Sequence, residues 1–306
     1  MKLFALFIAG FAAIGVYAQE TPQPAFEFLS RFPHIRDFTI SEDQDEAFFT
    51  VQSPNEEIAV IACMKQQEGK WLEYEIVPFT GQYRDIEPFL APDGLRLYFS
   101  SDRPLKDGVE VPKDYDIWYV ERKDAGSSWS APVNLGAPVN TSGNEFYPSL
   151  STNGNLYFTS DAMTMLSKDD IYCSKWEGGK YTAPVPLDKA VNSAGYEFNA
   201  YISPGEDFLI YTAYGRKEGF GSGDLYISQK DAKGNWKEAM NMGEKINSAA
   251  MDYCPFYDVK TNTLYFTSKR SAIVPGQFMS MKDFLKIADQ YENGLSRIYK
   301  VTWKGV

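Results

Sequence analysis

Histidine and cysteine are scarce in this chain, and their scarcity removes several kinds of catalytic and metal site. Among 306 residues there is one histidine, His34, and there are three cysteines. A Ser-His-Asp triad would have to use His34, and no Gly-x-Ser-x-Gly motif accompanies it, so we do not expect a serine hydrolase. No CxxC pair or Cys/His cluster has the spacing of a zinc site. Cys63, Cys173 and Cys254 each fall within an apolar strand-like pattern, which predicts buried thiols, while a disulfide between two of them stays open.

Long apolar runs are also missing, except at the N-terminus. Leu3 to Val16 is an apolar run of about 14 residues, shorter than the roughly 20 that a membrane-spanning helix needs. A lysine precedes this run and a small-x-small cleavage site ends at Ala18. Residues 1–18 therefore resemble a cleaved signal peptide, and residues 19–306 form the mature domain. We expect a periplasmic or secreted protein without a membrane span.

Basic residues are outnumbered by acidic ones. The chain has 30 lysines and arginines against 41 aspartates and glutamates, for a net charge of −11. Such an acidic surface disfavours nucleic acids and anionic lipids as partners. It is compatible with bound cations, with basic patches on other proteins, or with nothing more than good solubility. Protein, peptide and glycan ligands remain open.

Helical periodicity is nearly absent, and an internal repeat takes its place. Three segments align without gaps: WSAPVNLGAPVNTSGNE from Trp129, YTAPVPLDKAVNSAGYE from Tyr181 and WKEAMNMGEKINSAAMD from Trp236. In each segment an asparagine follows the aromatic residue by eleven positions, and a carboxylate follows the asparagine by five. The pairs are Asn140 with Glu145, Asn192 with Glu197, and Asn247 with Asp252. Three matched spacings indicate a structural repeat.

A second block follows each carboxylate. Its copies are PFLAPDGLRLYFSSDR from Pro88, PSLSTNGNLYFTSDA from Pro148, PFYDVKTNTLYFTSKR from Pro255 and a looser AYISPGEDFLIYTAYGR from Ala200. A third strand-like pattern then opens at Asp116, Asp170, Asp224 and Arg297. Alternating aromatic and β-branched residues between Gly, Asn and Asp turns are typical of strands. Four strands in about 50 to 60 residues correspond to one propeller blade.

The units begin near residues 36, 84, 141, 193 and 248, which predicts an all-β propeller of five blades, with six as the alternative count. The last unit ends after its third strand. Because an open ring would expose a sheet edge, we expect a strand near Phe26 to Leu29 to close it. Four aromatic residues should occupy equivalent positions near the start of the outer strands and pack between blades: Trp71, Trp129, Tyr181 and Trp236.

The repeat resembles the TolB-type β-propeller repeat (the WD40-like repeat) of exported bacterial proteins. APDGLRLYFSSDR with a following DIW, and STNGNLYFTSD with a following DIY, carry that pattern over roughly residues 82–272. The resemblance implies a propeller fold within a family that includes binding modules and enzyme appendages. TolB itself is similar to six-bladed propellers with an extra domain, so the five units counted here depart from it.

The repeated carboxylates are the candidate site residues. Strands alternate in direction across a blade, so connections between blades emerge on the same face as the loops between second and third strands. The candidates on this loop-rich face are Asp85, Glu145, Glu197 and Asp252, with Arg103, Arg216 and Arg270 in the loops. One hypothesis is an acidic ring that binds a basic group or, weakly, Ca²⁺, with no other cofactor. The other is that each carboxylate accepts turn N–H groups or pairs with a loop arginine, and fastens its blade.

One insert interrupts the last unit and predicts a helical segment near residues 278–293. Ser280 and Asp283 resemble a capping box. We expect this helix on the loop-rich face, packed on the propeller and covering part of the ring, with docking of a partner as the alternative. The side chains that share one helical face are Met281, Phe284, Leu285, Ala288 and Tyr291.

The function favoured by these patterns is that of a non-catalytic exported propeller, which binds a protein, peptide or glycan on its loop-rich face. The alternative is a carboxylate-dependent hydrolase of glycosides or lactones at the channel mouth, with Ca²⁺ as an optional aid. Glycosidase chemistry needs two carboxylates about 5 to 10 Å apart in a deep pocket. A shallow ring of paired acids would favour binding.

Overall fold

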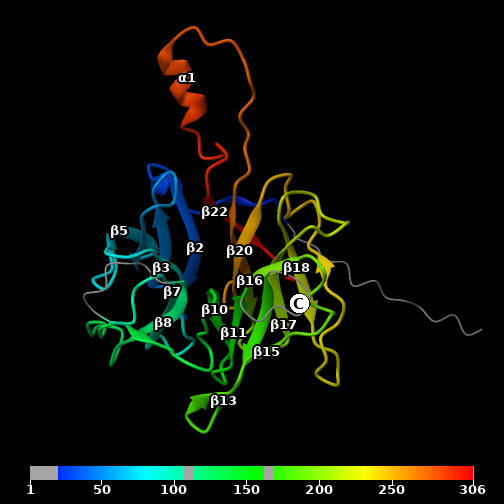
Figure 1. Cartoon of the computed structure of the whole chain (residues 1–306). Helices are drawn as coiled ribbons and strands as arrows, with labels where there is room; N and C mark the ends of the chain where they lie inside the picture. Colours follow the sequence, from blue (N-terminus) through cyan, green and yellow to red (C-terminus); the bar gives the residue numbers. More distant parts are fainter. Residues whose placement is uncertain (1–19, 107–113, 162–168, 306) are drawn as a thin grey trace, which may run out of the picture.

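The computed structural model describes residues 20–106, 114–161 and 169–305, which form a five-bladed β-propeller (Figure 1). Each blade is a four-stranded antiparallel sheet, and the inner strands of neighbouring blades contact each other around the axis. The predicted all-β fold and the count of five blades are confirmed. The predicted signal peptide lies outside the described residues.

The blades follow one another along the chain. From the inner to the outer strand, the first two are β2 (His34–Ile40), β3 (Glu46–Gln52), β4 (Ala59–Gln67), β5 (Lys70–Ile76), and β6 (Asp85–Leu90), β7 (Arg96–Ser101), β8 (Asp116–Glu121), β9 (Val133–Asn134). The next two are β10 (Glu145–Leu150), β11 (Leu156–Ser160), β12 (Asp170–Ser174), β15 (Val185–Pro186), and β16 (Tyr196–Ile202), β17 (Phe208–Tyr214), β18 (Asp224–Gln229), β19 (Met240–Asn241). The last is β20 (Asp252–Asp258), β21 (Thr263–Ser268), β22 (Arg297–Thr302) and β1 (Gln23–Pro24).

The two faces of the propeller differ. The upper face, at the top of Figure 1, carries the connections between blades and the loops between second and third strands. One of these loops, residues 271–296, is the arm, which contains α1 (Met281–Ala288). The lower face carries the turns between first and second strands and a hairpin of β13 (Trp176–Glu177) and β14 (Lys180–Tyr181). The loop-rich face of the prediction is therefore the upper face.

The N-terminal segment closes the ring, as predicted, but with other residues than expected. β1 pairs with β22 through Gln23 and Lys300 and through Pro24 and Tyr299. Phe26 to Leu29, the predicted strand, instead lies in and before a 3-10 helix, η1 (Glu27–Leu29). This correction has a physical reason: Phe26 and Leu29 leave the sheet edge to fill the seam between the fifth and first blades, where they are buried.

Arg297 holds the closing segment in place. At the corresponding position the second, third and fourth blades have aspartate, whereas here the buried guanidinium donates to the carbonyl oxygens of Ser30, Phe32 and Pro33 at 2.9 to 3.2 Å. Ile35 N also donates to Ser296 O at 3.1 Å. Arg297 thus replaces the aspartate of three other blades and joins the last strand to the N-terminal segment.

Large aromatic side chains pack between blades. Trp129 lies 6.0 Å from Phe48 between ring centroids, and Trp236 lies 6.5 Å from Tyr157. Tyr181 lies beside Tyr98. Phe48, Tyr98 and Tyr157 occupy equivalent places on the second strand of the preceding blade, which confirms the predicted equivalence.

The fourth predicted aromatic residue meets the closing segment. Trp71 belongs to the first blade, and its ring lies 5.9 Å from Phe26, which in turn stacks 6.3 Å from Tyr265 of the fifth blade. Phe26 therefore bridges the seam that other blades close by direct contact. In the described part of the chain, the three cysteines form no disulfide, and no helix is long and apolar enough to cross a bilayer.

Candidate functional site

The four repeated carboxylates lie at the upper ends of the inner strands, as predicted, but their side chains are buried within the turns. Asp85, Glu145, Glu197 and Asp252 each show 0% exposure. A ring that attracts a ligand by its charge needs accessible carboxylates. The structure instead surrounds each carboxylate with donors from its own blade and from the preceding connection.

Three of the four carboxylates form ion pairs with the predicted loop arginines. Asp85 lies 2.6 Å from Arg103, Glu197 lies 3.0 Å from Arg216, and Asp252 lies 2.7 Å from Arg270. Each guanidinium also donates to a carbonyl of the incoming connection, at Phe79, Val191 and Ile246 respectively. Each acid and arginine therefore tie the connection to the loop of the same blade.

Glu145 differs from the other three because no arginine accompanies it among the described residues. Its carboxylate accepts from Thr141 N at 3.0 Å, from Thr141 Oγ1 at 2.5 Å and from Ser160 Oγ at 3.3 Å. Burial raises the pKa of Glu145 to about 7, while the Thr141 bonds oppose that rise. Among the described residues, hydroxyl and N–H groups therefore hold this carboxylate of the third blade, whereas an arginine does so in the second, fourth and fifth blades.

The repeated asparagines explain the spacing found in the sequence. Asn140 accepts from Ile117 N at 2.9 Å and donates to Ile117 O at 2.9 Å, so its amide imitates a strand residue. Asn192 and Asn247 do the same with Ile171 and Leu225. The hydroxyl residue after each asparagine then bonds the carboxylate of the next blade. The asparagine and the hydroxyl residue that follows it therefore connect the third strand of one blade to the first strand of the next.

A second set of polar residues lies deeper, at the axis. A bulge interrupts every inner strand, and the residue at each bulge has a φ between +51° and +61°. We call this set the axial layer: Asp37, Glu87, Tyr147, Asn199 and Cys254. Such conformations cost about 1 to 3 kcal/mol each in residues with side chains. They turn N–H groups toward the preceding blade: Glu87 to Thr50, Asn199 to Thr159 and Asp37 to Thr267.

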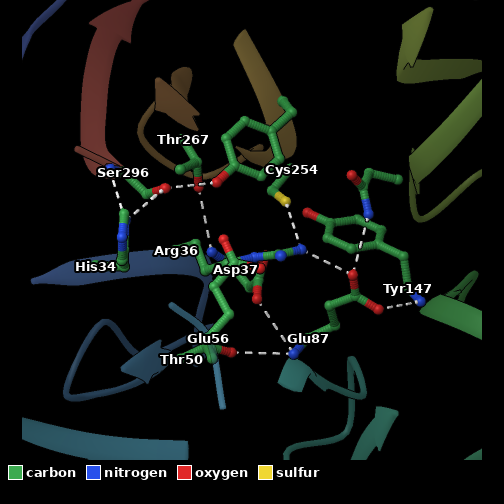
Figure 2. Close-up of polar contacts among 12 residues, drawn as sticks. His34, Arg36, Asp37, Thr50, Glu56, Glu87, Tyr147, Cys254, Thr267 and Ser296 are labelled. Carbon is green, nitrogen blue, oxygen red and sulfur yellow. Dashed lines mark hydrogen bonds and ion pairs between the residues drawn. The ribbon is translucent and has the colours of Figure 1, made fainter. Parts of the chain in front are cut away.

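Arg36 neutralises the carboxylates of the axial layer (Figure 2). Its guanidinium lies 2.8 Å from Asp37 Oδ1 and 2.9 Å from Glu87 Oε1. Glu87 also accepts from Tyr147 N at 2.7 Å and from Asn199 Nδ2 at 3.3 Å. Burial raises the pKa of Glu87 to about 7, with Arg36 lowering it and Asp37 adding to the rise. The layer is a closed network that spans the centre of the ring.

Sequence reasoning missed the axial layer. Its five residues differ in type from blade to blade, so no repeat marks them, and a bulge leaves no trace in strand alternation. The available signal was position, since Glu87, Tyr147, Asn199 and Cys254 each come two residues after a ring carboxylate. Within the described chain, no group of three or more His, Cys, Asp or Glu side chains is placed to hold a metal ion.

His34 has a structural environment. Its Nδ1 accepts from Ser296 N at 3.2 Å (Figure 2). Its Nε2 lies 3.2 Å from Pro54 O. Burial lowers the pKa of His34. The imidazole therefore joins the first inner strand to the root of the arm.

The arm departs from its predicted position. Ser280 caps α1 as predicted, accepting from Asp283 N at 3.1 Å. However, no residue of α1 is buried, and Figure 1 shows the helix standing away from the propeller. The prediction that it packs on the ring is wrong. Only the root is anchored: Tyr291 lies 5.5 Å from Tyr299 between ring centroids, and its hydroxyl donates to Ile298 O at 2.6 Å.

Comparison with known proteins shows the fold. No protein-family model matches the sequence, and no curated protein matches it either. A TolB protein from Agrobacterium tumefaciens is 14% identical with a TM-score of 0.50, over 89% of this chain and 91% of that one. The α-L-arabinofuranosidase from Podospora anserina and the catalytic domain of that from Coprinopsis cinerea are each 12% identical, with TM-scores of 0.52 over 94% of this chain and 95% of theirs.

These likenesses concern the fold alone. The chain is a TolB-like β-propeller in fold, with arabinofuranosidases among the similar structures. At 12 to 14% identity, the shared feature is the arrangement of blades. Because one fold carries unrelated functions, the function has to be argued from this chain's own residues.

Proposed function

We propose that this protein is a non-catalytic exported propeller that binds a protein or peptide partner on its upper face, with the arm as the contact element. The observation that carries the proposal is the exposure of apolar side chains along the arm. Met279 is 84% exposed, Val274 76% and Met281 69%. Contiguous apolar surface of this kind marks interaction sites in soluble proteins.

The chemistry of the arm favours a protein or peptide over a glycan. Met281, Phe284 and Leu285 lie on one side of α1, and Phe284 is braced at 5.5 Å by Phe278. An amphipathic helix of this type docks its apolar face into an apolar groove. The methionines add adaptable, polarisable contacts. Glycan binding would call for planar polar side chains, which this side of the helix lacks.

A site-specific crosslink tests this proposal in the producing cell. A photoreactive residue in place of Met281 should yield a defined crosslinked species, whereas the same residue at exposed Val133 should not. The double variant Phe284→Asp with Leu285→Asp should abolish binding of the isolated, identified partner without lowering the melting temperature. Equal crosslinking from both positions, or self-association of the protein through the arm, would contradict the proposal.

Export is part of the proposal and rests on the sequence of residues 1–18. Protein recovered from the cell envelope or the medium should begin at Gln19 when its N-terminus is sequenced. Recovery from the cytoplasm with Met1 retained would contradict export.

The competing candidate is a carboxylate-dependent hydrolase, a function that the arabinofuranosidases of similar fold suggest. Glu145, with its pKa of about 7, is the one ring carboxylate suited to proton transfer. Against it stand the burial of all four ring carboxylates and the ion pairs of three of them. Assays with aryl glycosides and lactones should therefore show no turnover. Turnover that is lost in Glu145→Gln would establish the hydrolase.

A weak calcium site is the remaining proposal for the ring. Because arginines and hydroxyl groups already occupy the carboxylate oxygens, calorimetric titration with Ca²⁺ should show no tight binding. Tight binding that disappears in Glu145→Gln combined with Glu197→Gln would make the ring a functional site.

A further inference from the structure

The lower end of the axis contains a cavity that the proposed function does not use. Its volume is about 800 Å³. The ends of all five inner strands and their following turns contribute to its walls, so it lies on the propeller axis, on the face opposite the arm. We call it the lower pocket. Cavities of roughly 300 to 1,000 Å³ with mainly apolar walls are typical of small-molecule sites.

Aromatic rings form the floor and one wall of the lower pocket. Phe89, Tyr201 and Phe256 line the inner end and are 7%, 4% and 9% exposed. The rings of Tyr201 and Phe256 meet at 5.4 Å and 71°. These three residues come two positions after the axial layer in their strands, so they separate the pocket from the ion pairs above.

The wall is formed by Trp176 and Tyr181 of the β13–β14 hairpin. Their rings meet edge to face at 4.8 Å and 66°, and Trp176 is 39% exposed. Gly154, at φ +84°, forms the neighbouring turn beneath the Trp176 side chain, in a backbone conformation that favours glycine. The hairpin thus presents a fixed indole at the lip of the pocket.

The two cations at the rim contact the protein itself. Arg96 pairs with Glu121 at 3.2 Å, and Lys260 Nζ donates to Glu42 O at 2.9 Å. Asp258 accepts from Lys260 N at 3.0 Å and from the hydroxyl of Thr261. Carboxylates of Glu42, Asp93 and Asp258 also line the pocket, so the charge at the rim disfavours an anion.

One polar group remains free at the floor. Tyr201 lines the pocket, and its hydroxyl has no hydrogen-bond partner within the described residues. By contrast, the hydroxyl of Tyr257 donates to Asn262 and to Trp303 O. A hydroxyl that lines an apolar pocket and has no partner in the protein gains from a ligand atom that completes its bond.

We propose that the lower pocket binds an uncharged, largely apolar organic molecule, which stacks against Trp176 and places one hydroxyl or carbonyl group at the Tyr201 hydroxyl. The apolar walls supply affinity, and Tyr201 supplies orientation. The site lies on the other face from the arm and stands independently of the partner proposed above.

Fluorescence titration with the uncharged probe N-phenyl-1-naphthylamine tests the site on the mature chain. We expect saturable binding of one molecule per chain. Trp176→Ala should weaken it about tenfold, the loss that removal of a stacked indole typically causes. Phe220→Ala, which truncates an aromatic residue 48% exposed on an upper-face loop, serves as the matched control and should leave binding unchanged. Replacement of residues 273–290 by a short Gly-Ser linker should also leave it unchanged, which separates the pocket from the arm.

Displacement of that probe tests the role of the free hydroxyl. 1-Naphthol should compete more strongly than naphthalene, and Tyr201→Phe should erase that difference while keeping the affinity for naphthalene. Variants are compared only after their melting temperatures are shown to match. Lack of saturable binding, or binding that Trp176→Ala leaves intact, would overturn the site. Tighter binding of xylotriose, of a quaternary ammonium ion or of an anionic naphthalene sulfonate would overturn the ligand class.

Discussion

Two apolar segments flank the fifth blade, and the structure treats them in opposite ways. The closing segment, residues 23–33, buries Phe26 and Leu29 at 3% and 0% exposure. The arm carries the same residue types, yet Phe284 and Leu285 are each 45% exposed. Both segments adjoin β22 and both contain a short helix.

This difference in burial depends on which surface each segment can pack against. The closing segment finds a seam between two blades that nothing else fills, with Trp71 on one side and Tyr265 on the other. The two ends of the arm pair with each other through an antiparallel β-bridge between Ser271 and Asn293. The helix beyond this bridge lies away from the surface of the propeller (Figure 1). Apolar periodicity tells which side of a segment avoids water, but it does not tell what that side packs against.

Deletion of residues 20–31 should have the largest effect. It removes β1, Phe26 and Leu29 together, and it exposes the edge of β22. We expect the melting temperature to fall by about 10 °C or more, followed by circular dichroism. Deleting a similar length of the arm, residues 275–286, is the control. Unchanged melting after the N-terminal deletion would mean that the ring is closed by other contacts.

Phe26→Ala narrows the test to one side chain. Truncation of a buried phenylalanine typically costs about 3 to 5 kcal/mol, and Phe26 touches both blades at the seam. Denaturant unfolding should show this loss, while Phe28→Ala, in the same segment but 48% exposed, should show little. Similar losses of unfolding free energy for both variants would show that Phe26 is not the side chain on which closure of the seam depends.

Arg297→Asp gives the fifth blade the residue that the second, third and fourth blades carry at this position. If stability depended only on having the residue type that the repeats share at this position, the substitution would be tolerated. Because the guanidinium donates to three carbonyl groups of the closing segment, we expect a loss of about 3 kcal/mol in the free energy of unfolding. Arg297→Lys should recover part of it, since a single ammonium group reaches fewer of these carbonyl oxygens.

Two carboxylates of the ring differ in the same way: Glu197 pairs with Arg216, whereas Glu145 pairs with no arginine among the described residues. Glu197→Gln leaves Arg216 buried without its counter-charge, for an expected cost of about 3 kcal/mol at neutral pH. Glu145→Gln should cost less and depend on pH. Because the folded-state pKa of Glu145, about 7, lies above its ordinary value of 4.5, its contribution to stability is present below pH 4.5 and is lost as the pH rises toward 7.

The cost of Glu145→Gln should therefore be smaller at pH 8 than at pH 4.5, by about 1 kcal/mol. Unfolding of both variants across this range checks the sign. A cost that grows with pH would show that Glu145 is stabilised as the anion in the folded protein.

Arm substitutions should have the smallest effect on stability. Phe284→Ser and Leu285→Ser alter side chains that touch little of the propeller, so each should change the free energy of unfolding by less than about 0.5 kcal/mol. A loss comparable to that of Phe26→Ala would show that the arm packs against the body in solution and would remove the contrast between the two segments.

The repeat spacing of this chain determined the fold: five blades, the equivalent interblade aromatics and the closing of the ring by the N-terminus. It did so because each blade buries the same faces, and burial imposes the same residue types at the same intervals. The spacing also marked Asp85, Glu145, Glu197 and Asp252. Only the tertiary structure shows that these carboxylates are bonded within the connections between blades. An aspartate or glutamate reads the same in the sequence whether its side chain faces solvent or an arginine.

Tertiary structure alone decided the rest. The axial layer depends on bulges and left-handed residues whose types vary from blade to blade, so no repeat records them. The lower pocket gathers residues from five turns and a hairpin that are far apart in the chain. The register of β1 and the standing position of the arm depend on which apolar surface is left uncovered once the blades have assembled. A sequence specifies local patterns strongly, whereas contacts between distant segments are chosen by the space that those patterns leave.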